Sequence, residues 1–141
     1  MKWVFIAGPF RGDGLETTKQ NNVEIARQHV LQFIEHEISY YSPHLNLSQE
    51  TITLGSYREP FAIDTHKIFL ELCHALAILP GWEQSMGTLE EIDRAKERGL
   101  PVFYLDQTGV WEELKNTLLS KSSKEGGHFV STLFTFTKIS V

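Results

Sequence analysis

The sequence predicts an α/β domain built on a mostly parallel β-sheet of five strands. Short, continuously apolar runs alternate with longer segments in which apolar residues recur at helical spacing. Continuously apolar strands are typical of a parallel sheet that helices cover on both faces, because such a sheet buries both sides of each strand. The chain of 141 residues contains no internal repeat and no linker, so residues 1–141 are expected to form one domain.

The first half of the chain predicts a strand, a helix and a second strand. The run KWVFIAG (2–8) is apolar and ends at a glycine, as a buried strand does. A helix is expected from about Thr17 to Glu35, since apolar residues recur there at helical spacing. Its expected core residues are Val23, Ala26, Val30, Phe33 and Ile34. The run ISYYS (38–42) is the second expected strand, and residues 43–56 are expected to form a long polar loop of the functional or mobile kind.

The second half continues the alternation. A helix is expected from about Phe61 to Cys73, and its candidate core residues are Ile63, Ile68, Phe69 and Leu72. The run ALAILP (75–80) is the third strand, and the helix that follows, Thr88 to Arg98, is ended by a glycine and a proline. The remaining elements are the strand PVFYL (101–105), a helix over 108–121 that carries Val110, Leu114 and Leu118, and a last strand over 128–139.

The composition argues against several classes of partner. The formal net charge of −5 disfavours a nucleic-acid polymer or an anionic membrane, but not a small nucleotide. Cys73 is the single cysteine, so no internal disulfide is expected and a reducing compartment is indicated. The apolar run WVFIAG is too short for a signal sequence or a membrane span, so a cytoplasmic protein is expected. The histidines show no metal-ligand spacing, and we expect neither a metal nor another cofactor.

Two glycine-containing turns, residues 8–14 and 81–87, follow the first and third expected strands. Parallel sheets bind ligands at the carboxyl ends of their strands, so the two turns are expected to build a single site. In the first turn, Gly8 and Gly12 let the backbone approach a ligand closely, and the guanidinium of Arg11 suits a phosphate or a carboxylate. The alternative is an ordinary glycine turn with a solvated arginine.

The helix after the second turn opens with two adjacent glutamates, Glu90 and Glu91. In a structural interpretation, Thr88 caps the helix, Glu91 reaches back to the N–H of Thr88, and Glu90 pairs with Arg94. In a chemical interpretation, the helical wheel places Glu91 on the flank of the buried face and turns Glu90 to solvent. The residues expected on that face are Leu89, Ile92 and Ala95. A carboxylate at a helix N-terminus is expected to stay ionised, which suits a nucleophile, so Glu91 is the catalytic candidate.

The segments VFIAGPFRG and LPGWEQSMGTLEE together resemble the nucleoside 2-deoxyribosyltransferase superfamily. The nearest likeness is to its branch of nucleoside 5′-monophosphate N-glycosidases and to deoxyribosyltransferase-like domains with Leu-Pro-Gly-Trp; it runs from residue 3 to about 105. The resemblance implies a flavodoxin-like, Rossmann-like three-layer sandwich, a nucleotide bound over the strand ends, and a covalent glycosyl-enzyme mechanism. It also implies a homodimer or larger homo-oligomer, in which the neighbouring chain helps to close the site.

The resemblance assigns roles to residues of both turns. The family's nucleophilic glutamate follows a Gly-x-x-x pattern, and the spacing from Gly87 places it on Glu91. Ser85 stands where the transferases have an aspartate that binds the sugar 5′-hydroxyl; the monophosphate glycosidases also have serine there, because an aspartate would repel a 5′-phosphate. The substrate-binding residues expected are Gly8, Phe10, Arg11 and Gly12 in the first turn and Ser85 and Gly87 in the second.

Two features depart from the family. Phe5 stands where the family has a tyrosine whose hydroxyl assists near the nucleophile. His66 and His74 stand where it has acids in the helix before the third strand, and Asp64 lies two residues before His66. Either His66 or Asp64 is expected to protonate the leaving base, the alternative being that His66 is a solvated surface histidine.

Two further residues are candidates for contact with the substrate. Trp82 either stacks on a base or packs against the edge of the sheet. His44, which follows the second strand, either makes a contact in the loop near the ligand or has no role.

The expected function is hydrolysis of the N-glycosidic bond of a nucleoside 5′-monophosphate through a covalent intermediate on Glu91. Hydrolysis and transfer share that intermediate, and Ser85 favours hydrolysis because the family's monophosphate enzymes are mostly hydrolases. The alternatives are a nucleoside 2-deoxyribosyltransferase and a non-catalytic nucleotide-binding module.

Overall fold

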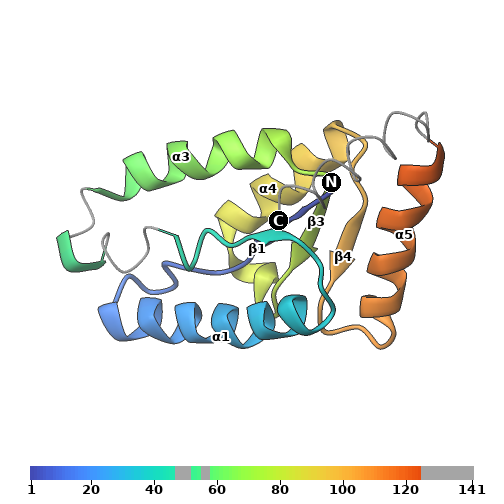
Figure 1. The fold of residues 1–141 in the computed structure, drawn as a ribbon. Coiled ribbons are helices and arrows are strands. Elements are labelled where there is room, and N and C mark those ends of the chain that lie inside the picture. The colour runs from blue at the N-terminus through green and yellow to red at the C-terminus, as the bar shows by residue number, and fades with distance from the viewer. Residues whose placement is uncertain (47–51, 55–57, 125–141) are drawn as a thin grey trace, which may run out of the picture.

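Four short apolar segments form a parallel sheet in the computed structural model, which describes residues 1–46, 52–54 and 58–124 (Figure 1). The strands are β1 (Val4–Ala7), β2 (Tyr40–Tyr41), β3 (Ala75–Ile78) and β4 (Val102–Tyr104), and their order across the sheet is β2-β1-β3-β4. The prediction of a mixed α/β fold with a parallel sheet is thus confirmed for four strands. The expected fifth strand, 128–139, lies outside the described residues.

The register aligns the carboxyl ends of the strands at one edge of the sheet. Val4 pairs with Tyr40 on one side and with Ala75 on the other, so β1 is central and its end is flanked by the ends of β2 and β3. Ligand-binding loops of parallel sheets emerge from this edge.

The longer helices in the described part of the chain are α1 (Glu16–Glu35), α3 (Glu59–Leu72), α4 (Met86–Glu97) and α5 (Val110–Lys124), and a short 3₁₀ helix, η2 (Trp82–Gln84), precedes α4. In Figure 1, α1 and α3 lie on opposite sides of the sheet. Among the described residues, no helix combines the length and the apolar character that a membrane crossing requires.

The hydrophobic core has two parts, because alternate strand residues point to opposite faces of the sheet. Val4 and Ile6 pack with residues of α1 and α5, including Ala26, Val30, Phe33, Val110 and Leu114. Phe5 and Ala7 pack on the other face with residues of α3 and α4, including Leu70, Ile92 and Ala95. Most of the core residues expected in α1 and α5 are therefore confirmed.

The core residues expected in α3 are mostly wrong. Ile63, Ile68 and Leu72 are 49%, 62% and 61% exposed, and the buried apolar residues of this helix are Ala62 and Leu70. Apolar residues surround nearly the whole circumference of α3, so their spacing does not reveal which stripe faces the sheet. Ile34 of α1 is also exposed, for it lies beside the buried stripe and not within it.

Two expected boundaries are wrong. α4 begins at Met86, two residues before the expected Thr88, and Ser85 is its N-cap. Residues 52–54 form a helical turn inside the segment 43–56 that was expected to be loop throughout.

Candidate functional site

The loops after β1, β2 and β3 meet at the carboxyl edge of the sheet. Gly8 lies so close to β3 that an added Cβ would come within 2.6 Å of the Cβ of Leu79. His44, in the turn after β2, bonds the carbonyl oxygen of Pro9 through Nε2 at 2.7 Å. The close approach of β1 and β3 therefore requires glycine at residue 8, and His44 ties the third loop to the first.

Glu91 is an isolated carboxyl group in the second turn of α4. Its side chain is half-buried, and no hydrogen bond or ion pair joins it to any residue in the described part of the chain. Burial raises its pKa to about 8, and the negative charge of Glu90 contributes to the rise. The expected position on the flank of the buried face is confirmed, whereas the raised pKa runs against the expected ionised carboxylate, because burial removes the carboxyl group from water.

The capping interpretation of the twin glutamates is also wrong. Ser85 is the N-cap: its Oγ accepts hydrogen bonds from the backbone N–H of Thr88 at 3.3 Å and from the Thr88 hydroxyl at 2.8 Å. Leu89, which was expected on the buried face of the helix, is 38% exposed, whereas Thr88 is buried. Glu91 therefore has no part in the cap, and the absence of a structural partner strengthens its candidacy as a functional group.

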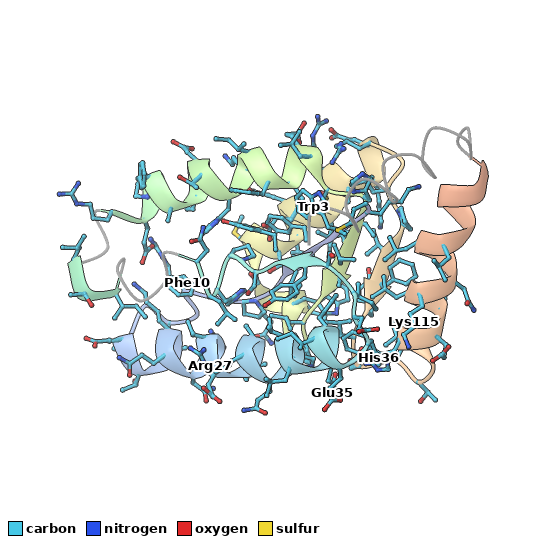
Figure 2. All side chains as sticks on the ribbon, viewed as in Figure 1. Trp3, Phe10, Arg27, Glu35, His36 and Lys115 are labelled. Carbon is cyan, nitrogen blue, oxygen red and sulfur yellow. The ribbon has the colours of Figure 1, made fainter. Side chains whose placement is uncertain are left out.

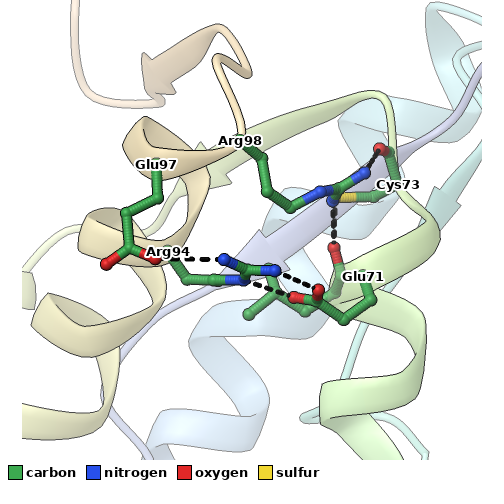
Figure 3. Close-up of polar contacts among 6 residues, drawn as sticks. Glu71, Cys73, Arg94, Glu97 and Arg98 are labelled. Carbon is green, nitrogen blue, oxygen red and sulfur yellow. Dashed lines mark hydrogen bonds and ion pairs between the residues drawn. The ribbon is translucent and has the colours of Figure 1, made fainter.

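Arg94 of α4 and its C-cap residue Arg98 bond the C-terminal end of α3 (Figure 3). Arg94 donates to Glu71 of α3 from Nε at 2.7 Å and from Nη2 at 2.5 Å. The expected pairing of Arg94 with Glu90 is therefore wrong. Arg98 donates to the carbonyl oxygens of Leu70 and Cys73, which caps the end of α3. Residues at i, i+3 and i+7 share one face of a helix, so Glu91 faces α3 one turn closer to the carboxyl edge.

The two expected acids on α3 differ in their surroundings. Asp64 is exposed, and it has no bond to Glu91. His66 is half-buried and its Nδ1 lies 2.8 Å from the hydroxyl of Tyr41, which also accepts a hydrogen bond from Nδ2 of Asn46 at 2.8 Å. The Tyr41 hydroxyl thus joins Asn46 and His66, with its O–H free to donate to Nδ1 of the neutral imidazole.

Partial burial favours the neutral form of the His66 imidazole. Burial lowers its pKa to about 4, and the nearby His44 contributes. A neutral imidazole is a weak proton donor near pH 7, so the structure does not favour His66 as the acid that protonates a leaving base.

His44 is buried, and burial lowers its pKa. Its Nε2–H donates to Pro9, and its Nδ1 has no partner among the described residues. The ring of Phe10 meets the His44 ring edge-on, with centroids 6.1 Å apart. Figure 2 shows Phe10 on the side of the molecule where α1 and α3 begin, away from Trp3 and His36. His44 is therefore primarily a contact within the loops.

Arg11 is already engaged by a carboxylate of the protein. Its Nε donates to Glu59 at 3.0 Å, and its Nη2 bonds the same carboxylate oxygen. The other oxygen of Glu59 is bonded by Lys19, whose ammonium lies 5.8 Å from the centroid of the Phe10 ring. Arg11 therefore differs from the alternative interpretation only in being ion-paired, since its side chain is 61% exposed.

Gly12 and Gly87 are in different situations. Gly12 has φ +56, a left-handed conformation that favours glycine, and an added Cβ would meet Thr18 at 2.6 Å. Gly87 is exposed within the first turn of α4, and a Cβ there would meet nothing within 4 Å. The fold therefore requires glycine at residue 12 and leaves open space at residue 87.

Trp82 packs against the edge of the sheet. Its ring lies 5.1 Å from that of Tyr104 in the edge strand β4, at an interplanar angle of 46°. Together they line an open cavity of about 280 Å³ with Glu83, Asp106 and Gln107. A cavity of about 520 Å³ lies at the opposite edge of the sheet, lined by residues of the α1–β2 connection, and it contains none of the expected site residues.

Three residues of this region were missed at the level of sequence: Lys19, Glu59 and Tyr41. A signal existed for Lys19, since it continues the buried stripe of Val23, Ala26 and Val30 at helical spacing, and a buried lysine requires a counter-ion. No local signal identified Glu59 as that counter-ion.

Within the described residues, no group of three or more His, Cys, Asp or Glu side chains is arranged to hold a metal ion. The chemistry offered in this region is that of the unpaired carboxyl group of Glu91 and of the exposed guanidinium of Arg11, which Glu59 holds.

Comparison with known proteins gives a family but no function. No curated protein matches the chain, and no solved structure matches it. One family profile, described as "Domain of unknown function (DUF7768)", matches residues 2–105, which include every element from β1 to β4. The chain therefore belongs to the DUF7768 family.

Proposed function

We propose that this chain hydrolyses the N-glycosidic bond of a nucleoside 5′-monophosphate, with Glu91 as the nucleophile. The observation that carries the proposal is the half-buried, unpartnered carboxyl group of Glu91, whose pKa burial raises to about 8, beside the carboxyl edge of a parallel sheet. The resemblance to the nucleoside 2-deoxyribosyltransferase superfamily supplies the reaction.

In the proposed reaction, the carboxylate of Glu91 forms a bond to the anomeric carbon as the bond from that carbon to the base breaks. The electron pair of the broken bond leaves with the base, which takes up a proton from solvent, and the attacking water of the next step returns one proton to solvent. Water then attacks the anomeric carbon and releases the sugar phosphate and Glu91. The finer fold proposal is a flavodoxin-like three-layer sandwich, which the strand order β2-β1-β3-β4 and the helices on both faces support.

The test is incubation with a panel of nucleoside monophosphates, followed by chromatography of the free base. We expect base release from the wild-type protein and its loss in Glu91→Gln. Glu90→Gln is the matched control, because Glu90 is exposed and carries the same charge one residue away. Equal turnover in the wild-type protein and in Glu91→Gln contradicts the proposal.

A second candidate is a non-catalytic nucleotide-binding module. The neutral, hydrogen-bonded His66 and the exposed Asp64 favour it, because neither is set to protonate a leaving base. Thermal stabilisation by a monophosphate without base release selects this candidate. Appearance of a new nucleoside when a second base is added selects a transferase.

The proposal includes a homodimer. The outer face of α3 carries Phe61, Ile68 and Leu72, which are 67%, 62% and 61% exposed. These residues lie at i, i+7 and i+11, so they form one apolar stripe along the helix. A second copy of the chain that covers this stripe would also approach the mouth of the site, because α3 borders the space that Glu91 faces.

A further inference from the structure

Arg11 in the loop after β1, Lys19 of α1 and Glu59 of α3 form a cluster of charged side chains with a net charge of +1. Arg11 and Lys19 each bond one carboxylate, that of Glu59. The side chains of Lys19 and Glu59 are only 9% and 6% exposed, whereas that of Arg11 is 61% exposed. The cluster therefore consists of a buried ion pair and a third, outer member.

Glu59 does not depend on Arg11 alone for its charge. Burial by itself would raise the pKa of this carboxyl group, but the hydrogen bonds and charges of Lys19 and Arg11 lower it below its ordinary value. If Arg11 leaves, the ammonium of Lys19 still neutralises the carboxylate in the same buried position. No buried charge is then left unpaired, which is the condition that makes the loss of an ion-pair partner costly.

Arg11 can leave without moving its loop. Its carbonyl oxygen accepts a hydrogen bond from the N–H of Gly14 at 2.9 Å, and the carbonyl oxygen of Phe10 accepts one from Nδ2 of Asn22 at 2.9 Å. The backbone is thus held by bonds that do not involve the guanidinium. The guanidinium itself is mostly in water and binds Glu59 through Nε and Nη2, a pair of donors that binds phosphate equally well.

We propose that Glu59 is an internal counter-ion that a phosphate monoester displaces from Arg11, so that Glu59 sets the affinity of this site for phosphate. The inference rests on the proposed function in one respect, the position of the phosphate at Arg11. Binding exchanges one ion pair for another: Arg11 moves from Glu59 to the phosphate, and Glu59 stays with Lys19. The net free energy of phosphate binding is the difference between the interactions of Arg11 with phosphate and with Glu59. The affinity for phosphate is therefore weaker than that of an arginine with no carboxylate partner.

The exchange predicts opposite effects of two variants on phosphate binding. Lys19→Met leaves Glu59 with Arg11 as its partner, so Arg11 can no longer leave without stranding a buried carboxylate, and the affinity for phosphate falls. Lys19→Met combined with Glu59→Gln removes both buried charges and frees Arg11, so the affinity rises above that of the wild-type protein, by up to about fivefold. Methionine replaces most of the apolar stem of Lys19 and removes the ammonium, together with its contact to the Phe10 ring.

The experiment is a titration with inorganic phosphate at constant ionic strength, followed by the NMR signal of the Arg11 Nε–H group. We expect this signal to shift in the wild-type protein and the dissociation constants to follow the order double variant, wild type, Lys19→Met, from tight to weak. A change of the same sign in both variants, or no phosphate-dependent shift in the wild-type protein, overturns the proposal.

Two controls complete the test. Arg27→Gln removes one positive charge from an exposed pair on α1, and its affinity for phosphate should match that of the wild-type protein. Glu112→Gln, which removes one negative charge from an exposed residue of α5, should bind phosphate with unchanged affinity. If the protein binds phosphate as described but releases no base, the proposed hydrolysis is refuted and the counter-ion role of Glu59 stands. If it releases base but does not bind phosphate as described, the counter-ion role is refuted and the proposed hydrolysis stands.

Discussion

Glu91 carries a carboxyl group that folding takes from water and pairs with nothing in the described residues. Its pKa rises from 4.5 to about 8 on folding, so the folded chain holds a proton that the unfolded chain has lost between those pH values. Below about pH 4.5 both states are protonated and the residue costs nothing. As the pH rises towards 8, the stability of the folded state falls, and above about pH 8 the full cost is present.

Glu91→Gln should therefore stabilise the protein in a pH-dependent way. We expect no gain in the free energy of unfolding near pH 4 and a gain of about 2 kcal/mol at pH 8.5, reduced from the full linkage value because a half-buried group keeps part of its water. Urea unfolding of the variant and the wild-type protein over this range measures the difference. Glu90→Gln should show at most a small gain, and an equal gain in both variants contradicts the assignment.

The same pKa fixes the sign of the pH dependence of catalysis. A nucleophile must be ionised, so kcat/KM for base release should rise with pH and level off above about pH 8, the pKa of Glu91 in the free protein. A fall above pH 8 would instead identify Glu91 as the proton donor to the base. The profile is measured by initial rates of base release between pH 5 and 9.5 in buffers of constant ionic strength.

At the scale of the helices, the start of α4 shows how a functional and a structural use of one residue can coincide. Ser85 accepts two hydrogen bonds from Thr88, yet its hydroxyl proton remains available to a ligand, because the oxygen acts as the acceptor in the bond from the Thr88 backbone. Its capping role and its proposed contact with a 5′-phosphate can be separated by substitution.

Ser85→Ala should lower the free energy of unfolding by about 1 kcal/mol, since alanine cannot cap α4. Ser85→Asp should restore that stability, because aspartate caps as well as serine, while it weakens the binding of nucleoside monophosphates relative to nucleosides by charge repulsion. Thermal unfolding measures the first effect and a competition assay the second. An unchanged preference for monophosphates in Ser85→Asp removes Ser85 from the proposed phosphate site.

The individual strands and helices were largely predictable, for identifiable reasons. The strands β1 and β3 are continuous apolar runs that a parallel sheet buries, and α1 has a single apolar stripe, so period and composition agree. The buried residues predicted for α3 were mostly wrong because its apolar residues lie all around the helix. The burial of Ala62 and Leu70 shows which side faces the sheet. The N-cap of α4 was misplaced because Ser85 and Thr88 both suit a cap, and the sequence does not say which carries the first helical turn.

At the scale of the whole molecule, the candidate site was predictable only where its residues follow directly from a strand. Arg11 and His44 lie in the loops after β1 and β2, and Glu91 lies near the start of the helix after β3; the topology of a parallel sheet places such positions towards one edge. The partners of these groups were not predictable. The bonds from Arg11 and Lys19 to Glu59 span 48 and 40 residues, and such pairings depend on how α1 and α3 pack and not on any local pattern.

The proposed homodimer follows from what the single chain leaves exposed on α3. Phe61→Asp should shift the protein towards the monomer, because it places a charge in the apolar stripe of Phe61, Ile68 and Leu72. Sedimentation equilibrium measures the association constant, and Ile34→Asp on α1 is the matched control, since Ile34 is comparably exposed outside the stripe. Each chain has a net charge of −5, so two copies repel, and raising NaCl from about 0.05 M to about 0.5 M should strengthen association of the wild-type chain. A monomeric wild-type protein at both salt concentrations, or equal dissociation by Phe61→Asp and Ile34→Asp, would show that the α3 stripe is not the interface.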